Sequence, residues 1–206
     1  AVLLGNPPKE FRATSTTISQ LVDTAGKLSQ NRRGALIVVD LGSDLRPEDF
    51  LYSGTNIEAQ LSTDLLINLF ATDTPLHDGA VLVKGNKIIS AGVILPLSRQ
   101  GISRYGTRHL AALGITERFD RCICIVVSEE TGTLSLASQG KLERPITSSR
   151  LQELLAKLIG NQNSMGANKA SLNKNVLSQK TDSGDNISDI NKKESEKSEI
   201  FINKKD

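Results

Sequence analysis

The order of apolar segments in the first 160 residues limits the fold of this 206-residue chain more than any other feature. Residues 34–40 and 121–128 are apolar runs with the length of buried strands. Strands at 80–84 and 87–95 are separated only by Gly85 and Asn86, and a strand at 133–138 follows the second run after four residues; both spacings indicate hairpins. Helices are predicted between these segments, so we expect an α/β fold, a mixed β-sheet with helices packed on it, in a single globular domain.

Four segments have the apolar spacing of helices that cover a sheet. The first, residues 15–30, carries Ile18, Leu21 and Leu28 on one face. The others are residues 62–71 capped by Ser62, residues 107–119 with a weak point at Gly114, and residues 149–159 with a Ser149–Gln152 capping box before Gly160.

The composition changes after Gly160. Asn, Lys and Ser make up half of residues 161–206, and the apolar residues there are scattered, so this segment is predicted to be a disordered tail. We divide the chain into an N-terminal linker at 1–14, a domain at 15–160 and the tail at 161–206.

Composition excludes several classes of function. The net charge is only +2 and aromatic residues are 3% with no Trp, so we expect no nucleic-acid partner. Two Cys exclude a disulfide scaffold, and two His exclude a metal site built on three histidines. No apolar run is long enough to span a membrane and no signal peptide is visible. Because the chain begins at Ala1 and its only Met is Met165, we expect residues upstream that are absent from this sequence.

Three polar clusters stand beside predicted strand ends. The first is His77-Asp78-Gly79-Ala80, ahead of the strand at 80–84. Asp78 could accept a proton from a hydroxyl, His77 could bind a metal or a phosphate, and Gly79 would let a ligand approach the backbone. Taken alone, an Asp-Gly pair is more often a simple turn.

The second and third clusters have the chemistry of ion-binding sites. Gly106-Thr107-Arg108-His109 lies where a helix should begin, and free backbone N–H groups with a guanidinium would bind an anion. The run Ser128-Glu129-Glu130-Thr131-Gly132 ends a strand, and its carboxylates could hold a divalent cation. Without a ligand, the second cluster would be an ordinary helix cap and the third a polar hairpin turn.

Together, the three clusters resemble the diadenylate cyclase domain family. The resemblance covers roughly residues 15–155 and rests on His77-Asp78-Gly79-Ala80, Thr107-Arg108-His109 and the run at 128–132. The third motif is more similar to the membrane-anchored bacterial branch than to the DNA-integrity-scanning branch.

This resemblance implies a reaction and a set of site residues. Two ATP molecules would be joined into the second messenger cyclic di-AMP, with release of two pyrophosphates, where two domains of a homodimer meet face to face. The implied catalytic residues are Asp78, which activates the 3′-hydroxyl, Gly79, Arg108 and His109. The implied ATP-binding residues are Gly79, Ala80, Thr107, Arg108, His109, Ser128 and Glu129. His77 and Glu130 would bind a divalent metal, Mg or Mn.

The resemblance also implies a location. The protein would be held at the cytoplasmic face of the bacterial cell membrane by an anchor upstream of residue 1, and the chain as given would be soluble. Its regulatory protein partner is unknown.

One departure from the family leaves alternatives open. The family commonly shows Arg-His-Arg, whereas this chain has Arg108-His109-Leu110. An active cyclase, in which Arg104 compensates for the lost guanidinium, competes with a catalytically weakened ATP-binding regulatory module of the same fold. A third alternative is an unrelated interaction domain in which all three clusters are turns.

Overall fold

The computed structural model describes the backbone of residues 9–100 and 105–160, and side chains from residue 14 onward within these ranges. The predicted tail at 161–206, residues 1–8 of the predicted linker and Arg104 therefore lie outside the described residues.

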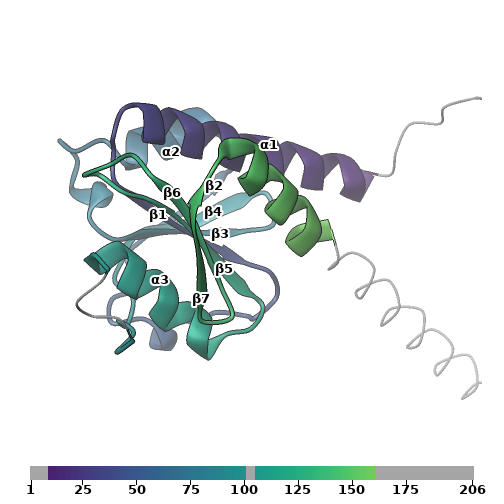
Figure 1. Cartoon of the computed structure of the whole chain (residues 1–206). Coiled ribbons are helices and arrows are strands. Elements are labelled where there is room, and N and C mark those ends of the chain that lie inside the picture. The colour runs from purple at the N-terminus through teal and green to yellow at the C-terminus, as the bar shows by residue number, and fades with distance from the viewer. Residues whose placement is uncertain (1–8, 101–104, 161–206) are drawn as a thin grey trace, which may run out of the picture. The chain divides into compact units, whose positions relative to one another are not determined.

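Within the described part of the chain, seven strands form one sheet in the order β2-β4-β3-β1-β5-β6-β7 (Figure 1). The strands are β1 (Ala35–Asp40), β2 (Thr55–Gln60), β3 (Ala80–Lys84), β4 (Lys87–Val93), β5 (Cys122–Val127), β6 (Leu134–Ser138) and β7 (Lys141–Ile146). The β1–β3 pair is parallel and the other neighbours are antiparallel. The predicted mixed sheet is thus confirmed, and both predicted hairpins, β3–β4 and β5–β6, are present.

Helices cover both faces of this sheet. Helix α1 (Lys9–Gln30), helix α2 (Thr63–Leu69) and a helix at residues 148–160 lie on one face, and α3 (Thr107–Arg118) lies on the other (Figure 1). Two short 3₁₀ turns, η1 (Pro47–Asp49) and η2 (Pro75–His77), lie in the connections. None of the helices seen in residues 9–100 and 105–160 is long and apolar enough to cross a membrane.

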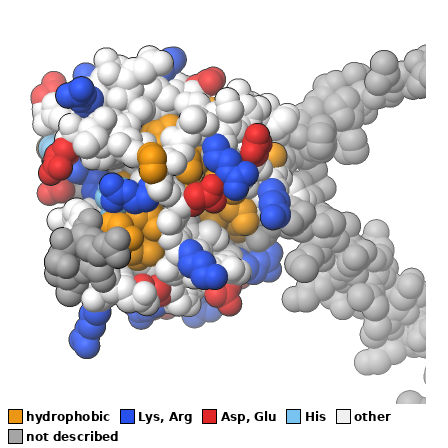
Figure 2. Space-filling model, viewed as in Figure 1, with side chains coloured by type: hydrophobic (Ala, Val, Ile, Leu, Met, Phe, Trp, Pro, Cys, Tyr) orange, Lys and Arg blue, Asp and Glu red, His pale blue; other side chains and the backbone are white. Residues whose placement is uncertain are grey.

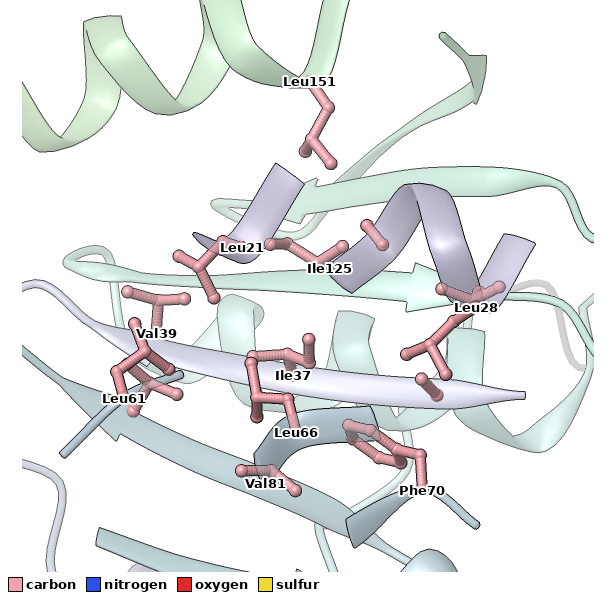
Figure 3. Packing of buried hydrophobic residues seen from close by; sticks show 14 of the residues in the cluster. Leu21, Leu28, Ile37, Val39, Leu61, Leu66, Phe70, Val81, Ile125 and Leu151 are labelled. Atoms are coloured by element: carbon pink, nitrogen blue, oxygen red, sulfur yellow. The ribbon is translucent and has the colours of Figure 1, made fainter. Parts of the chain in front are cut away.

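The side-chain alternation of β1 divides the core into two layers. Ile37 and Val39 pack with Leu21 of α1 and Leu66 of α2 (Figure 3). The intervening residues of β1 point to the other face and pack against α3. Both faces of this central strand are therefore buried, which explains why its sequence is almost continuously apolar.

Two helix starts differ from the predicted ones. Helix α1 begins at Lys9 rather than residue 15, because the Ser and Thr residues at 14–17 lie inside the helix and the preceding sequence is itself favourable to helix. The last helix begins at residue 148, where the Thr147 hydroxyl accepts a hydrogen bond from the Arg150 N–H (3.1 Å). Ser149 is consequently inside the first turn and is not the cap.

The outer surface carries mixed charge. On the face seen in Figure 2, acidic and basic side chains are interspersed around exposed apolar ones, with no broad patch of a single sign. On this face, charge selectivity would therefore have to arise from a local group of residues.

Candidate active site

Strand register brings the three polar clusters to one edge of the sheet. In the parallel pair of β1 and β3, Ile37 lies opposite Val81. Gly34 and Asp78, each three residues earlier, therefore lie at the same height along the two strands. In the antiparallel pair of β1 and β5, Ala35 lies opposite Val127, so Ser128, which follows β5, lies at the same edge. Segments distant in the sequence therefore meet beside the start of α3.

An apolar cavity of about 300 Å³ opens at this edge. We call it the apolar cavity, because Leu36, Val93, Ile94, Leu95, Leu97 and Ala111 form most of its wall. Its polar wall contains Asp78, Gly79, Thr107, Arg108 and Glu129. It has room for an organic ring system with a carboxylate at its side.

A second space of about 330 Å³, here called the polar cavity, adjoins the first. Its wall consists of Gly106, Thr107, Arg108, His109, Val127, Ser128, Glu129, Glu130, Thr131 and Arg144. Thr107, Arg108 and Glu129 line both cavities. One elongated ligand with an apolar end and a charged end can therefore occupy the two together.

The start of α3 forms the floor of the polar cavity. Gly106 is its N-cap and, among the described side chains, none hydrogen-bonds to this helix end as a cap. The first N–H groups of the helix and the positive end of its dipole are thus available to an anion.

Arg108 is held at the border of the two cavities by an ion pair. Its Nη1 donates to Glu129 Oε2 at 2.6 Å. A Cβ added to the buried Gly34 would lie 2.7 Å from both of these atoms, so a larger residue there would make the ends of the two side chains shift from this geometry. Sequence analysis did not select Gly34; the only signal was its place directly before a buried strand.

His109 is buried and supports the site through a neutral ring. Its Nε2 lies 3.1 Å from the Ser135 hydroxyl oxygen on β6. Burial, and to a lesser degree the charge of Arg144, lowers the pKa of His109. At neutral pH the imidazole is therefore uncharged, and it links α3 to β6 through Ser135.

Asp78 and Gly79 occupy the turn between η2 and β3. The Asp78 side chain is exposed at the apolar cavity. Gly79 has φ +113°, and a Cβ there would lie 2.7 Å from the Gly92 carbonyl carbon and 2.9 Å from the Val93 oxygen. Glycine is thus required by the neighbouring strand β4, in addition to the ligand access predicted from sequence. Ala80 is fully buried under α3 and lines neither cavity.

The two predicted metal ligands are not brought together. Glu130 lines the polar cavity, whereas His77 lines neither cavity and hydrogen-bonds through Nδ1 to the Thr74 carbonyl. Throughout the part of the chain that the structure covers, no group of three or more His, Cys, Asp or Glu side chains is placed to hold a metal.

Arg144 of β7 is a site residue that sequence reasoning missed. It stands on the wall of the polar cavity, 36 positions after Arg108 in the sequence and outside every motif. Leu110, where an arginine was expected, is buried and lines neither cavity.

Fold and site define an α/β domain in which a helix start without a side-chain cap lies beside an apolar cavity that has a carboxylate on its wall. The sequence matches the family model described as "DAC: DisA bacterial checkpoint controller nucleotide-binding" over residues 22–142. The chain belongs to this family, and the resemblance stated from the sequence is confirmed.

Named relatives agree. Cyclic di-AMP synthase CdaA of Bacillus subtilis is 40% identical over 153 residues, which are 73% of this chain and 54% of that protein. A diadenylate cyclase of Listeria monocytogenes is 47% identical over 132 residues, 63% of this chain and 47% of that protein. The chain thus spans about half the length of these curated relatives. Among solved structures, a double mutant of DacA from Staphylococcus aureus matches with TM-score 0.64 and 37% identity, covering 70% of this chain and 95% of that one.

Proposed function

We propose that this chain is a diadenylate cyclase, which condenses two ATP molecules into cyclic di-AMP and releases two pyrophosphates. The observation that carries the proposal is the sheet register, because it sets Asp78 across one cavity from Thr107 and Arg108 at the start of α3. The names of the relatives, cyclic di-AMP synthase and diadenylate cyclase, support the same activity.

The two cavities suit the two ends of ATP. Adenine is apolar on its faces and fits between Ile94, Leu95 and Leu97, whereas the triphosphate requires donors and positive charge. These are provided by Arg108 and the free N–H groups of α3, with the Ser128 hydroxyl on the same wall. His109 positions this wall through Ser135.

In the proposed reaction, Asp78 accepts the proton of a 3′-hydroxyl of one ATP. The freed oxygen attacks the α-phosphorus of the second ATP, the bond to the β-phosphate oxygen breaks, and pyrophosphate leaves. Repetition on the other side closes the ring. Such transfer depends mainly on positioning and on charge stabilisation, which a fixed helix start and Arg108 supply.

Two ATP molecules require two domains. Each domain has one pair of cavities at this edge, so we propose that two copies meet face to face with Asp78 and Arg108 of both at the shared site. The homodimer is then part of the mechanism.

One side chain on the wall of the polar cavity is suited to bind a divalent cation. Glu130 provides one carboxylate on the wall of the polar cavity, and Mg²⁺ or Mn²⁺ is commonly held by one or two carboxylates together with substrate phosphates. When bound, such a cation would offset phosphate charge and favour departure of pyrophosphate. His77 as a second ligand stays a prediction from the resemblance.

Location and domain limits also stay proposals. The resemblance supports a place at the cytoplasmic face of the membrane through an anchor upstream of residue 1. The catalytic domain is taken as residues 15–160, extended to Lys9 by the start of α1.

The test is incubation of the purified chain with ATP and Mg²⁺ or Mn²⁺, followed by chromatography for cyclic di-AMP and pyrophosphate. We expect two pyrophosphates for each cyclic di-AMP. ATP binding without product, over several metals and protein concentrations, would instead identify the weakened regulatory module. Absence of ATP binding would leave the unrelated interaction domain.

A further inference from the structure

The polar cavity contains a second guanidinium, from a strand that carries none of the sequence motifs. Arg144 of β7 shares this wall with Thr107, Arg108 and Ser128. We infer that Arg144 is the second arginine of the triphosphate site in this chain, in place of an arginine at position 110. The inference rests on the proposed function and goes beyond it by naming a substrate-binding residue.

Position 110 is unsuited to that task here. Leu110 is 7% exposed on α3, and its carbonyl accepts the Ser98 N–H at 2.9 Å. It lines neither cavity, whereas Arg144 lies on the wall of the polar one. The second positive charge therefore comes from β7 rather than from α3.

The charge of the wall favours such a residue. Apart from Arg144, the ionisable side chains of the wall that are charged at neutral pH are Arg108, Glu129 and Glu130, one positive and two negative. Arg108 is also already paired with Glu129. A triphosphate would meet a net negative surface, and Arg144 restores the balance before any cation binds.

Arg144 is free to act on a ligand. Among the residues for which side chains are described, no carboxylate forms an ion pair with it, although its neighbour Glu143 accepts from Arg150 at 2.8 Å. Its guanidinium carbon lies 5.7 Å from the centre of the Tyr105 ring, and this cation–π contact favours a position directly before the N-cap of α3.

Strand pairing gives the same placement independently. Glu143 and Ile146 of β7 pair with Leu136 and Leu134 of β6, so Arg144 lies beside the segment that contains Ser135. Ser135 is the hydrogen-bond partner of His109, and the charge of Arg144 contributes to lowering the pKa of His109. The guanidinium is thus near the first turn of α3, where the phosphates would bind.

The test compares Arg144→Gln and Arg144→Lys with the matched control Lys141→Gln. Lys141 is exposed on the same strand, outside both cavities, and its substitution removes the same charge. Titration calorimetry with Mg²⁺ measures the affinity for ATP and, separately, for adenosine. We expect Arg144→Gln to weaken ATP binding by about tenfold or more and adenosine binding by less than about twofold.

Arg144→Lys should recover part of the ATP affinity, because lysine keeps the positive charge but cannot form the bidentate hydrogen bonds of a guanidinium. Lys141→Gln should leave both affinities unchanged. Equal ATP affinity in Arg144→Gln and Lys141→Gln would overturn the inference while wild-type binding of ATP upholds the nucleotide site. Equal loss of ATP and adenosine binding would overturn it as well, since it would show a structural role. A wild-type chain that binds no ATP would remove both this inference and the proposed function.

Discussion

At the scale of single residues, the proposed chemistry depends on the carboxylate of Asp78. Asp78→Asn keeps the size of the side chain but removes the proton acceptor, so turnover should fall by about 10²-fold or more while ATP affinity changes little. Cyclic di-AMP formation and calorimetric ATP binding check the two effects. Asp73→Asn, at an exposed aspartate that lines neither cavity, is the matched control. Turnover of Asp78→Asn near that of Asp73→Asn would remove Asp78 from its proposed role.

The buried His109 leads to a prediction about how the stability of the folded chain depends on pH. Its pKa in the folded chain is lowered by burial and by Arg144, so the unfolded chain takes up the proton first as the pH falls. The stability that His109 contributes is therefore complete above pH 6.5, the ordinary histidine value, and is lost as the pH falls toward the lowered pKa.

The melting temperature between pH 7.5 and pH 5 checks this. The wild-type chain should lose more stability over this range than His109→Gln, which has no proton to take up. His77→Gln is the control for loss of an imidazole elsewhere. Parallel curves for wild type and His109→Gln would contradict the assignment of a neutral, buried His109.

At the scale of elements, Gly114 fixes the distance between α3 and the segment after β4. A Cβ at this position would lie 2.1 Å from the Pro96 oxygen and 2.7 Å from the Ser98 nitrogen. Gly114→Ala should therefore destabilise the domain by about 2–3 kcal/mol, through displacement of backbone that has no room to move. It should also weaken ATP binding, because α3 carries Thr107 and Arg108.

The matched control is Gly160→Ala, also in a helix but with no atom within 4 Å of the added Cβ. It should change the free energy of unfolding by less than about 0.5 kcal/mol, because Gly160 is the last described residue of its helix and the larger preference for Ala over Gly applies to helix interiors. Urea denaturation measures both changes. A loss in Gly114→Ala no larger than a few tenths of a kcal/mol would show that α3 shifts freely.

How well each element could be predicted follows from its burial. Strands β1 and β5 are buried on both faces, so their apolar runs were unambiguous. Strands β2 and β7 are the two edges of the sheet and mostly exposed, and β7 contains Pro145. β2 alternates only through the half-buried Ile57 and Ala59, and β7 shows no alternation, so neither strand was predicted.

The same reason explains what was missed in the site. Asp78 and Arg108 belong to compact motifs next to predictable strands and helices. Arg144 lies on the unpredicted edge strand β7, and Gly34 matters only because Arg108 and Glu129 meet beside it. Contacts set by sheet order, rather than by nearness in sequence, require the structure.

At the scale of the whole molecule, the proposed reaction makes activity depend on concentration. If one domain holds one ATP, as proposed, specific activity should rise with protein concentration until dimers dominate. Activity measured over a hundredfold dilution, with sedimentation to give the oligomeric state, checks this. Constant specific activity in a chain that is monomeric throughout would contradict a two-domain mechanism.

An exposed apolar surface beside the apolar cavity allows a more specific test of the proposed dimer contact. Leu51 is 71% exposed and Leu97 51%, and Leu97 lies on the cavity wall. If the copies meet face to face at this edge, Leu51→Ser should move the activity curve to higher protein concentration and leave the plateau unchanged. A lowered plateau with an unchanged midpoint would place Leu51 outside the dimer contact.

The ion pair between Arg108 and Glu129 gives the unliganded site its own counter-ion. This pair uses one guanidinium nitrogen, Nη1, and a phosphate bound at Arg108 would compete with the Glu129 carboxylate for the same positive charge. A singly charged anion such as chloride would gain less from that competition than a multiply charged phosphate chain. Because the Glu129 side chain is 61% exposed, we expect the resulting preference for phosphate to be modest.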